Sequence, residues 1–236
     1  MMVWMEHLTK NTPEQLKAFA ARIDSYFIGQ RAKIATRDLQ RYFLSEDETF
    51  TGRHFERFAD NDHPNRITER DLIAIEMLSV TLPPRAAIWV LGQGQARISV
   101  ELDNLPANVD LWEHPDLMRP GGPMINLWRL LSRDANWPEG RSGGNDVGKA
   151  KTSKLIAAKR PRLAPILDSV VCDALGPVKD RWEAFAHAMA DPERRDRIER
   201  ALPDGIEIGV LRAVDVVVWM AGRHRCSGDP SPVRTQ

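Results

Sequence analysis

The sequence predicts an all-α protein, from repeated helix-capping signals and from apolar residues at helical spacing. Residues 12–15 combine an N-cap threonine, a proline at the first helical position and a capping-box glutamine. Thr68 with Asp71 gives the same kind of start signal further on. Residues 96–102 alternate between apolar and polar and could form a strand, but an isolated strand would have no partner. We therefore prefer a helix there.

The first predicted helix follows Thr12 and ends at Gly29, because glycine commonly terminates helices. Its apolar stripe keeps a helical period and consists of Leu16, Phe19, Ala20, Ile23 and Phe27. The second follows Thr68 and stops before Pro83-Pro84, after which residues 86–91 form a short helix ended by Gly92.

The segment 105–123 is rich in proline, glycine, aspartate and asparagine and is predicted to be a long loop. A helix over 124–133 precedes a second loop, 136–146, that holds three glycines. A basic helix follows, and further helices are predicted near 178–190, 192–201 and 207–221. Residues 1–222 are thus expected to form a single helical unit, and 223–236 a disordered tail.

Composition is typical of a soluble globular protein, with 42% hydrophobic and 28% charged residues among 236. No apolar run approaches the ~20 residues that a membrane span needs, so no membrane association is expected. The first residues do not resemble a secretory signal. Cys172 and Cys226 are too few for a disulfide framework, which favours a reduced, cytoplasmic protein.

Positive charge is concentrated in one segment, although 33 basic residues balance 33 acidic ones overall. Between Arg141 and Arg162 there are seven cations and one acid, Asp146. Such local concentration favours a phosphate backbone, and therefore DNA, as the partner. The alternative is a solvated amphipathic helix whose Leu155 and Ile156 face inward.

Asp168 follows the basic segment and stands directly before Ser169 at a predicted helix start. An aspartate there is a good N-cap, which would contribute about 1 kcal/mol to stability. Capping alone accounts for this residue, and a catalytic carboxylate would have the same local geometry.

The stretch 147–176 resembles the helix-hairpin-helix DNA glycosylase superfamily, with the hairpin region extending over 143–176. Val147-Gly148 matches the end of the glycine hairpin, 167–169 (Leu-Asp-Ser) the catalytic-aspartate element, and Leu175-Gly176 the closing pair. The resemblance implies two helical lobes and a cleft, with Asp168 at its mouth stabilising the sugar cation as the base leaves. Asp146 replaces the first hairpin glycine, and Val170 the histidine that often follows the aspartate.

The resemblance also implies DNA contacts and a reaction type. The implied DNA-binding residues are Val147, Gly148, Lys149, Lys151, Thr152, Lys154, Lys159, Arg160 and Arg162. Ala150 stands where bifunctional members carry a Schiff-base lysine, so an active protein would be a monofunctional N-glycosylase on a flipped base. Lys149 and Lys151 flank that position, and the choice between them and no lysine stays open.

The whole chain resembles an uncharacterised family of soluble bacterial proteins. The matching residues are Phe50-Thr51-Gly52, Phe55-Glu56, 71–74 (Asp-Leu-Ile-Ala), 78–80 (Leu-Ser-Val), 110–112 (Asp-Leu-Trp) and 153–155 (Ser-Lys-Leu). This resemblance supports a single unit and implies no activity.

Other chemistry-bearing residues give weaker signals. In the cluster 50–56, Arg53, His54 and Glu56 could line a pocket, but Thr51 as an N-cap is the favoured interpretation. The six histidines lack metal-ligand spacing, and neither metal nor cofactor is expected. Of the tryptophans, Trp112 and Trp137 lie in loops and are candidates for base stacking, while Trp89, Trp182 and Trp219 read as core.

Two other classes of function remain open. A non-catalytic DNA-binding module would keep the hairpin and use Asp168 only as a cap. A helical protein-interaction domain would have no nucleic-acid role, and the overall neutrality of the chain is compatible with it.

Overall fold

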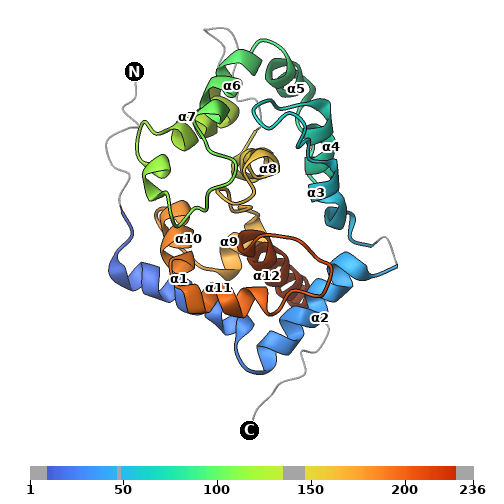
Figure 1. The fold of residues 1–236 in the computed structure, drawn as a ribbon, viewed down its shortest axis with the longest axis vertical. Helices are drawn as coiled ribbons and strands as arrows, with labels where there is room; N and C mark the ends of the chain where they lie inside the picture. Colours follow the sequence, from blue (N-terminus) through green and yellow to red (C-terminus); the bar gives the residue numbers. More distant parts are fainter. Residues whose placement is uncertain (1–9, 47–48, 135–146, 227–236) are drawn as a thin grey trace.

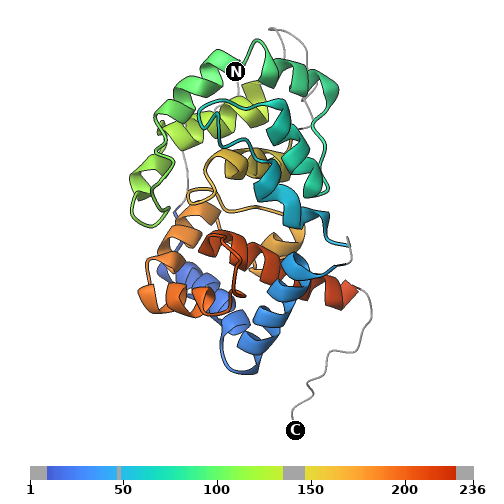
Figure 2. The same cartoon turned by 45° about the vertical axis from the view of Figure 1, so that its right-hand side comes forward.

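The helices at the two ends of the chain pack together, and the helices from its middle form a second group (Figures 1 and 2). The computed structural model describes residues 10–46, 49–134 and 147–226. Every regular element in these ranges is helical, which confirms the all-α prediction. None of the helices described is long and apolar enough to cross a membrane.

The terminal helix group contains α1, α2 and α9–α12. Their bounds are α1 Pro13–Phe27, α2 Gln30–Leu44, α9 Ser169–Ala174, α10 Arg181–Met189, α11 Pro192–Glu199 and α12 Val210–Cys226. Helix α1 packs on α2 and α10, while α12 packs on α2, α9 and α11. The predicted capping box at Thr12 is confirmed, because its hydroxyl accepts from the Gln15 N–H and the Gln15 side chain accepts from the Thr12 N–H.

The central helix group contains α3 to α8. Its elements are the 3₁₀ turn η1 Thr51–His54, α3 Phe55–Phe58, α4 Glu69–Met77, α5 Pro84–Leu91, α6 Gln95–Asp103, the 3₁₀ turn η2 Pro115–Met118, α7 Pro123–Arg129, the π-helical turn η3 Leu130–Asp134 and α8 Lys149–Lys159. Helix α8 lies against α4 and α7. The helix preferred over a strand at 96–102 is confirmed as α6, and the capping box of Thr68 and Asp71 starts α4.

The structure differs from the sequence-based prediction at α2 and at the end of α12, and η2 lies within the predicted loop 105–123. Helix α2 was not anticipated, because Gly29 occupies its N-cap without any side-chain cap. Residues 223–226 continue α12, so the predicted tail began too early. Gly222 does not end this helix. It lets α12 approach α9 closely, since a Cβ there would overlap the side chain of Val170. The glycine loop at 136–146 and residues 227–236 lie outside the described residues.

Helix α8 is buried on all sides from Thr152 onward, although three cations lie in or next to this stretch. Lys159 extends its ammonium to the carboxylate of Asp71 on α4, with 2.6 Å between Nζ and Oδ2. The same Nζ donates to the main-chain carbonyls of Asp60 at 2.7 Å and His63 at 3.1 Å. A buried charge is tolerated when it is paired and hydrogen-bonded in this way.

Arg160, which caps the C-terminus of α8, is 1% exposed and holds two irregular segments of the central group. Its guanidinium donates to the carbonyls of Leu105 and Leu102, both at 2.6 Å, and to that of Pro64 at 2.8 Å. It also donates to the Asn65 side chain. Buried carbonyls in irregular segments need such donors, because leaving them unpaired costs free energy.

We expect Lys159→Met to lower the free energy of unfolding by about 3–5 kcal/mol, because Asp71 would remain buried without its counter-charge. Arg162→Met is the matched control, since Arg162 is exposed and pairs with Asp110 at the surface. It should cost only about 0–1 kcal/mol. Urea denaturation measures both, and equal losses in the two variants would contradict the difference in burial.

Candidate functional site

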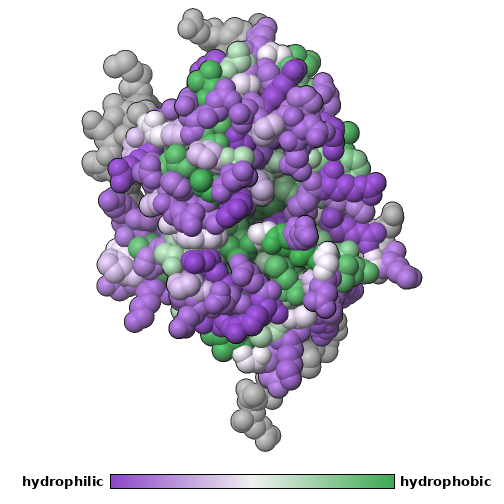
Figure 3. Space-filling model, viewed as in Figure 1, coloured by the Kyte–Doolittle hydropathy of each residue, from purple (hydrophilic) through white to green (hydrophobic). Residues whose placement is uncertain are grey.

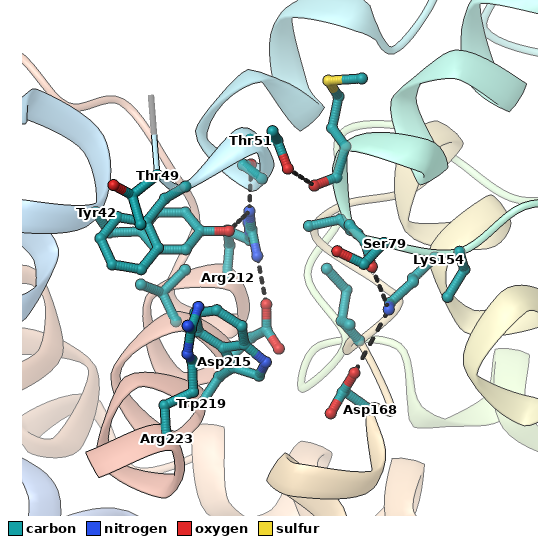
Figure 4. A pocket seen from close by; sticks show the side chains of 17 residues that line it. Tyr42, Thr49, Thr51, Ser79, Lys154, Asp168, Arg212, Asp215, Trp219 and Arg223 are labelled. Atoms are coloured by element: carbon teal, nitrogen blue, oxygen red, sulfur yellow. Dashed lines mark hydrogen bonds and ion pairs between the residues drawn. The ribbon is translucent and has the colours of Figure 1, made fainter. Parts of the chain in front are cut away.

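A pocket of about 190 Å³ lies where the terminal helix group meets the central helix group. The surface is hollowed between the two groups on the face seen in Figure 3. Figure 4 shows the side chains that line the pocket. Those that carry its chemistry are Tyr42, Lys154, Asp168, Arg212, Asp215 and Trp219. They come from α2, α8, the start of α9 and α12.

Arg212 is the central cation of the wall formed by α12. Its Nε donates to Glu56 Oε1 at 2.7 Å, and its Nη2 donates to the Gly52 carbonyl at 2.8 Å and to Tyr42 Oη at 3.2 Å. Its Nη1 pairs with Asp215. Burial alone would lower the pKa of Arg212, but the charges of Glu56 and Asp215 and the hydrogen bond to Tyr42 raise it overall, so the guanidinium stays charged.

Gly52 must be glycine for this arrangement, because a Cβ at that position would overlap the Tyr42 hydroxyl. Any larger residue would therefore displace Tyr42 from Arg212. The ring of Tyr42 stacks on Phe50 with centroids 5.4 Å apart, and Trp219 meets both rings edge-on at 6.1 and 6.2 Å. These three aromatic side chains form an apolar wall beside the charged groups.

Asp215 is 6% exposed and faces the pocket beside Arg212 (Figure 4). Burial raises its pKa to about 6, against the lowering effects of Arg212 and Lys154 and with a further rise from the charge of Asp168. One guanidinium also serves two carboxylates here, since Arg212 pairs with Glu56 as well. A carboxyl in this environment holds a proton more readily than one in water.

Lys154 and Asp168 face each other on the opposite wall. The Lys154 Nζ lies 3.5 Å from Asp168 Oδ2 and donates to the Leu78 carbonyl at 2.9 Å. The lysine side chain is 4% exposed and that of Asp168 is 22% exposed, so the carboxylate is the more accessible partner. Burial lowers the pKa of Lys154, and the charges of Asp168 and Asp215 partly offset this effect.

Asp168 caps α9, as its position before Ser169 predicted. Its Oδ1 accepts from the Val170 N–H at 2.8 Å, which leaves Oδ2 for Lys154 and the pocket. Helix α9 is short, with Leu175 as its C-cap, because the next residue, Gly176, has a φ of 73° in the left-handed region. Asp168 therefore both caps α9 and lines the pocket.

The cluster 50–56 contributes to the pocket differently from the prediction. Thr51 is not an N-cap. Its hydroxyl donates to the Met77 carbonyl at 2.8 Å, which ties η1 to the end of α4. Phe50, Thr51 and Gly52 line the pocket, whereas Arg53, His54 and Glu56 do not. Glu56 influences the pocket through its ion pair with Arg212.

The structure separates the predicted DNA-binding residues into two sets. Gly148, Lys149 and Arg162 are exposed, Lys151 is half-buried, and Arg162 is engaged with Asp110. The buried set consists of Val147, Thr152, Lys154, Lys159 and Arg160. The burial of Lys154, Lys159 and Arg160 does not fit the DNA contacts expected of these three residues, nor the alternative of a solvated helix face. The three cations face inward because main-chain carbonyls and aspartates elsewhere in the fold bind them.

Sequence reasoning missed Tyr42, Arg212 and Asp215 and assigned Trp219 to the core. A signal was available, since Arg212 and Asp215 are three residues apart in an otherwise apolar helix start, where charges need partners. Trp112 is half-buried with Arg195 4.9 Å above its ring, and it lies away from this pocket. Trp137 lies outside the described residues. Within the described ranges, no group of three or more histidine, cysteine, aspartate or glutamate residues is placed to hold a metal.

The chain belongs to a family of unknown function, DUF6308, whose pattern matches residues 35–222. The match includes α12 as far as Gly222 and four charged residues of the pocket, Lys154, Asp168, Arg212 and Asp215, while Arg223 lies just beyond it. Comparison with curated proteins and with solved structures finds no match.

We expect the pKa of Asp215 to respond in opposite directions to two substitutions in the pocket. Lys154→Met should raise it, because the ammonium favours the carboxylate, and Asp168→Asn should lower it, because a nearby negative charge is removed. The titration is followed by NMR of aspartate labelled at the carboxyl carbon. Lys17→Met on the exposed face of α1 should leave it unchanged.

The raised pKa also fixes the sign of a stability change with pH. The folded protein keeps the Asp215 proton up to about pH 6, whereas the ordinary pKa of an aspartate is 3.8. The contribution of Asp215 to the free energy of unfolding is therefore complete below about pH 3.8 and is lost as the pH rises through about 6. Movement of the Asp215 pKa in the same direction in Lys154→Met and Asp168→Asn would contradict the opposite effects assigned to these two charges.

Proposed function

We propose that the protein binds DNA and acts as a monofunctional DNA N-glycosylase on a base flipped into the pocket. One observation carries this proposal. Asp168, which caps α9, also lines a pocket between the two helix groups, with Lys154 3.5 Å from its second oxygen. A carboxylate held at a helix start beside a cavity is suited to stabilising a sugar cation as the base leaves.

Three features keep Asp168 suited to that role. The Val170 N–H fixes one oxygen, the Lys154 ammonium lies 3.5 Å from the other, and the partly exposed side chain is accessible to a substrate. Positive dipole ends of helices add to the stabilisation of an anion at this position. The departing base would lie between this wall and the rings of Tyr42, Phe50 and Trp219.

The N-terminus of α8 supports contact with the DNA backbone. Gly148 is its N-cap and provides no side chain, so the N–H groups of the first turn have no side-chain cap. Lys149 is exposed beside them. Its positive charge opposes the burial that raises the pKa of the Cys172 thiol, so this turn lies near α9. Main-chain N–H groups and lysines at a helix N-terminus are a common phosphate-binding arrangement.

A lysine-linked reaction is the second mechanism to test. Ala150 stands at the Schiff-base position of the resemblance, and Lys154 is the lysine that lines the pocket. Its Nζ is engaged by the Leu78 carbonyl and Asp168, which favours a positioning role over nucleophilic attack. Borohydride should therefore trap no covalent DNA adduct, and abasic products should stay uncut until alkali is added.

A non-catalytic DNA-binding module is the alternative, and the Asp168 cap bond favours it, because that bond by itself accounts for an aspartate at this position. The two proposals share the α8 contacts and differ only in base release. A panel of duplexes carrying uracil, hypoxanthine, oxidised guanine, alkylated purines or modified cytosines distinguishes them.

We expect Asp168→Asn to abolish base release and to leave folding and DNA binding nearly unchanged. Asparagine caps a helix about as well as aspartate, but its neutral amide cannot stabilise a sugar cation. Single-turnover assays on the duplex panel measure release, and urea denaturation checks stability. Release that survives in Asp168→Asn would remove this residue from the mechanism.

Lys149→Glu combined with Lys151→Glu should weaken duplex binding to a similar degree for all sequences and flatten its dependence on salt. Lys17→Glu combined with Lys33→Glu makes the same charge change on the exposed faces of α1 and α2 and is the matched control. Fluorescence anisotropy at several salt concentrations measures both pairs. Equal losses in the two pairs would show general electrostatics rather than a site at α8.

A further inference from the structure

Asp215 and Asp168 lie on opposite walls of the pocket and have different surroundings (Figure 4). Asp168 has a main-chain N–H on one oxygen and the Lys154 ammonium near the other. Asp215 pairs with Arg212, whose guanidinium also pairs with Glu56. Two carboxyls whose environments differ in this way commonly divide the roles of charged group and proton donor.

The charged and titratable groups that face Asp215 come from α2, α8, the start of α9 and α12 itself. Arg212 lies one turn earlier on α12, Lys154 reaches in from α8, and Tyr42 of α2 lies across the guanidinium. Asp168 adds a negative charge from the start of α9. Arg212 binds Oδ2 of Asp215, and among the described residues no hydrogen bond is made to Oδ1, which is left for a ligand in the pocket.

We propose that Asp215 is a second catalytic carboxyl, which in its protonated form donates its proton to a ring nitrogen of a neutral purine base held in the pocket. The inference rests on the proposed function for its reaction step. Its binding step stands on the geometry of the pocket alone.

The chemistry of the leaving group selects this class of base. A neutral purine leaves poorly unless one of its ring nitrogens is protonated, whereas uracil can leave as a stabilised anion. A base that already carries positive charge, such as an N-alkylated purine, would meet the cations Lys154 and Arg212 in the same pocket. The apolar wall of Tyr42, Phe50 and Trp219 suits a flat ring system.

The reaction balances with water as the co-reactant. As the bond between C1′ and N9 breaks, its electron pair stays on the purine, and the Asp215 proton goes to another ring nitrogen. The oxygen of a water molecule then bonds to C1′, and the proton lost by that water goes to Asp168. The products are the free purine and an abasic sugar, and solvent returns the proton from Asp168 to Asp215.

The binding step is tested with free hypoxanthine and the full-length protein by titration calorimetry between about pH 5 and pH 7.5, where this purine is neutral. The affinity of the wild type should fall by up to about tenfold per pH unit above the pKa of Asp215, and binding near neutral pH should take up about one proton. Asp215→Asn should bind more weakly and without this dependence on pH. Asp38→Asn, a buried aspartate of α2 outside the pocket, should behave like the wild type.

A second variant keeps the test decisive if Asp215→Asn does not fold. Asp168→Asn should still bind hypoxanthine, but the loss of affinity should begin at a lower pH, because a charge that raises the pKa of Asp215 is gone. The inference is overturned if the wild type does not bind hypoxanthine at about pH 5, or if its affinity does not change with pH. Unchanged pH dependence in Asp215→Asn would overturn it as well.

Base release from the duplex panel separates this inference from the proposed function. Binding that depends on Asp215 without release from any duplex would remove the glycosylase proposal and keep the base site. Release whose pH profile is the same in wild type and Asp215→Asn would keep the glycosylase and remove Asp215 as its proton donor.

Discussion

The inward orientation of the cations of α8 is the constraint on which the rest of the structure depends. Lys159 and Arg160 donate to carbonyls of irregular segments that follow α3 and α6, and Lys154 donates to the carbonyl of Leu78 after α4. These segments lack a regular hydrogen-bond ladder, and buried carbonyls without donors are costly. Helix α8 is therefore the buried helix against which α4 and α7 of the central helix group pack.

The pocket lies where α8 faces a second buried cation, Arg212 on α12. Arg212 joins α2, η1 and α3 through Tyr42, Gly52 and Glu56, so it fixes the wall that faces Lys154 and Asp168. Both α8 and α12 place a cation beside a carboxyl. They differ in that Asp168 also accepts a main-chain N–H, whereas Asp215 competes with Glu56 for one guanidinium. That difference gives the two carboxyl groups of the pocket unlike surroundings.

Local sequence signals predicted the parts of this structure that depend on neighbouring residues. The capping boxes at Thr12 and Thr68 and the Asp168 cap are all present, because a cap bond joins residues two or three positions apart. The direction of the lysines in α8 was not predictable in this way. A run of cations and apolar residues is compatible with a solvated helix face. The groups that hold Lys159 in the interior, the carboxylate of Asp71 and the carbonyl of Asp60, belong to distant segments of the chain.

The sequence by itself determined that the chain is helical, where most helices begin, and that Asp168 starts one of them. Only the tertiary structure decided that Lys154 and Asp168 meet Arg212 and Asp215 across one pocket, and that Lys159 and Arg160 are part of the interior. The physical reason is that helix formation and capping are short-range, whereas the fate of a charged side chain depends on the desolvation and counter-charges that long-range packing brings to it.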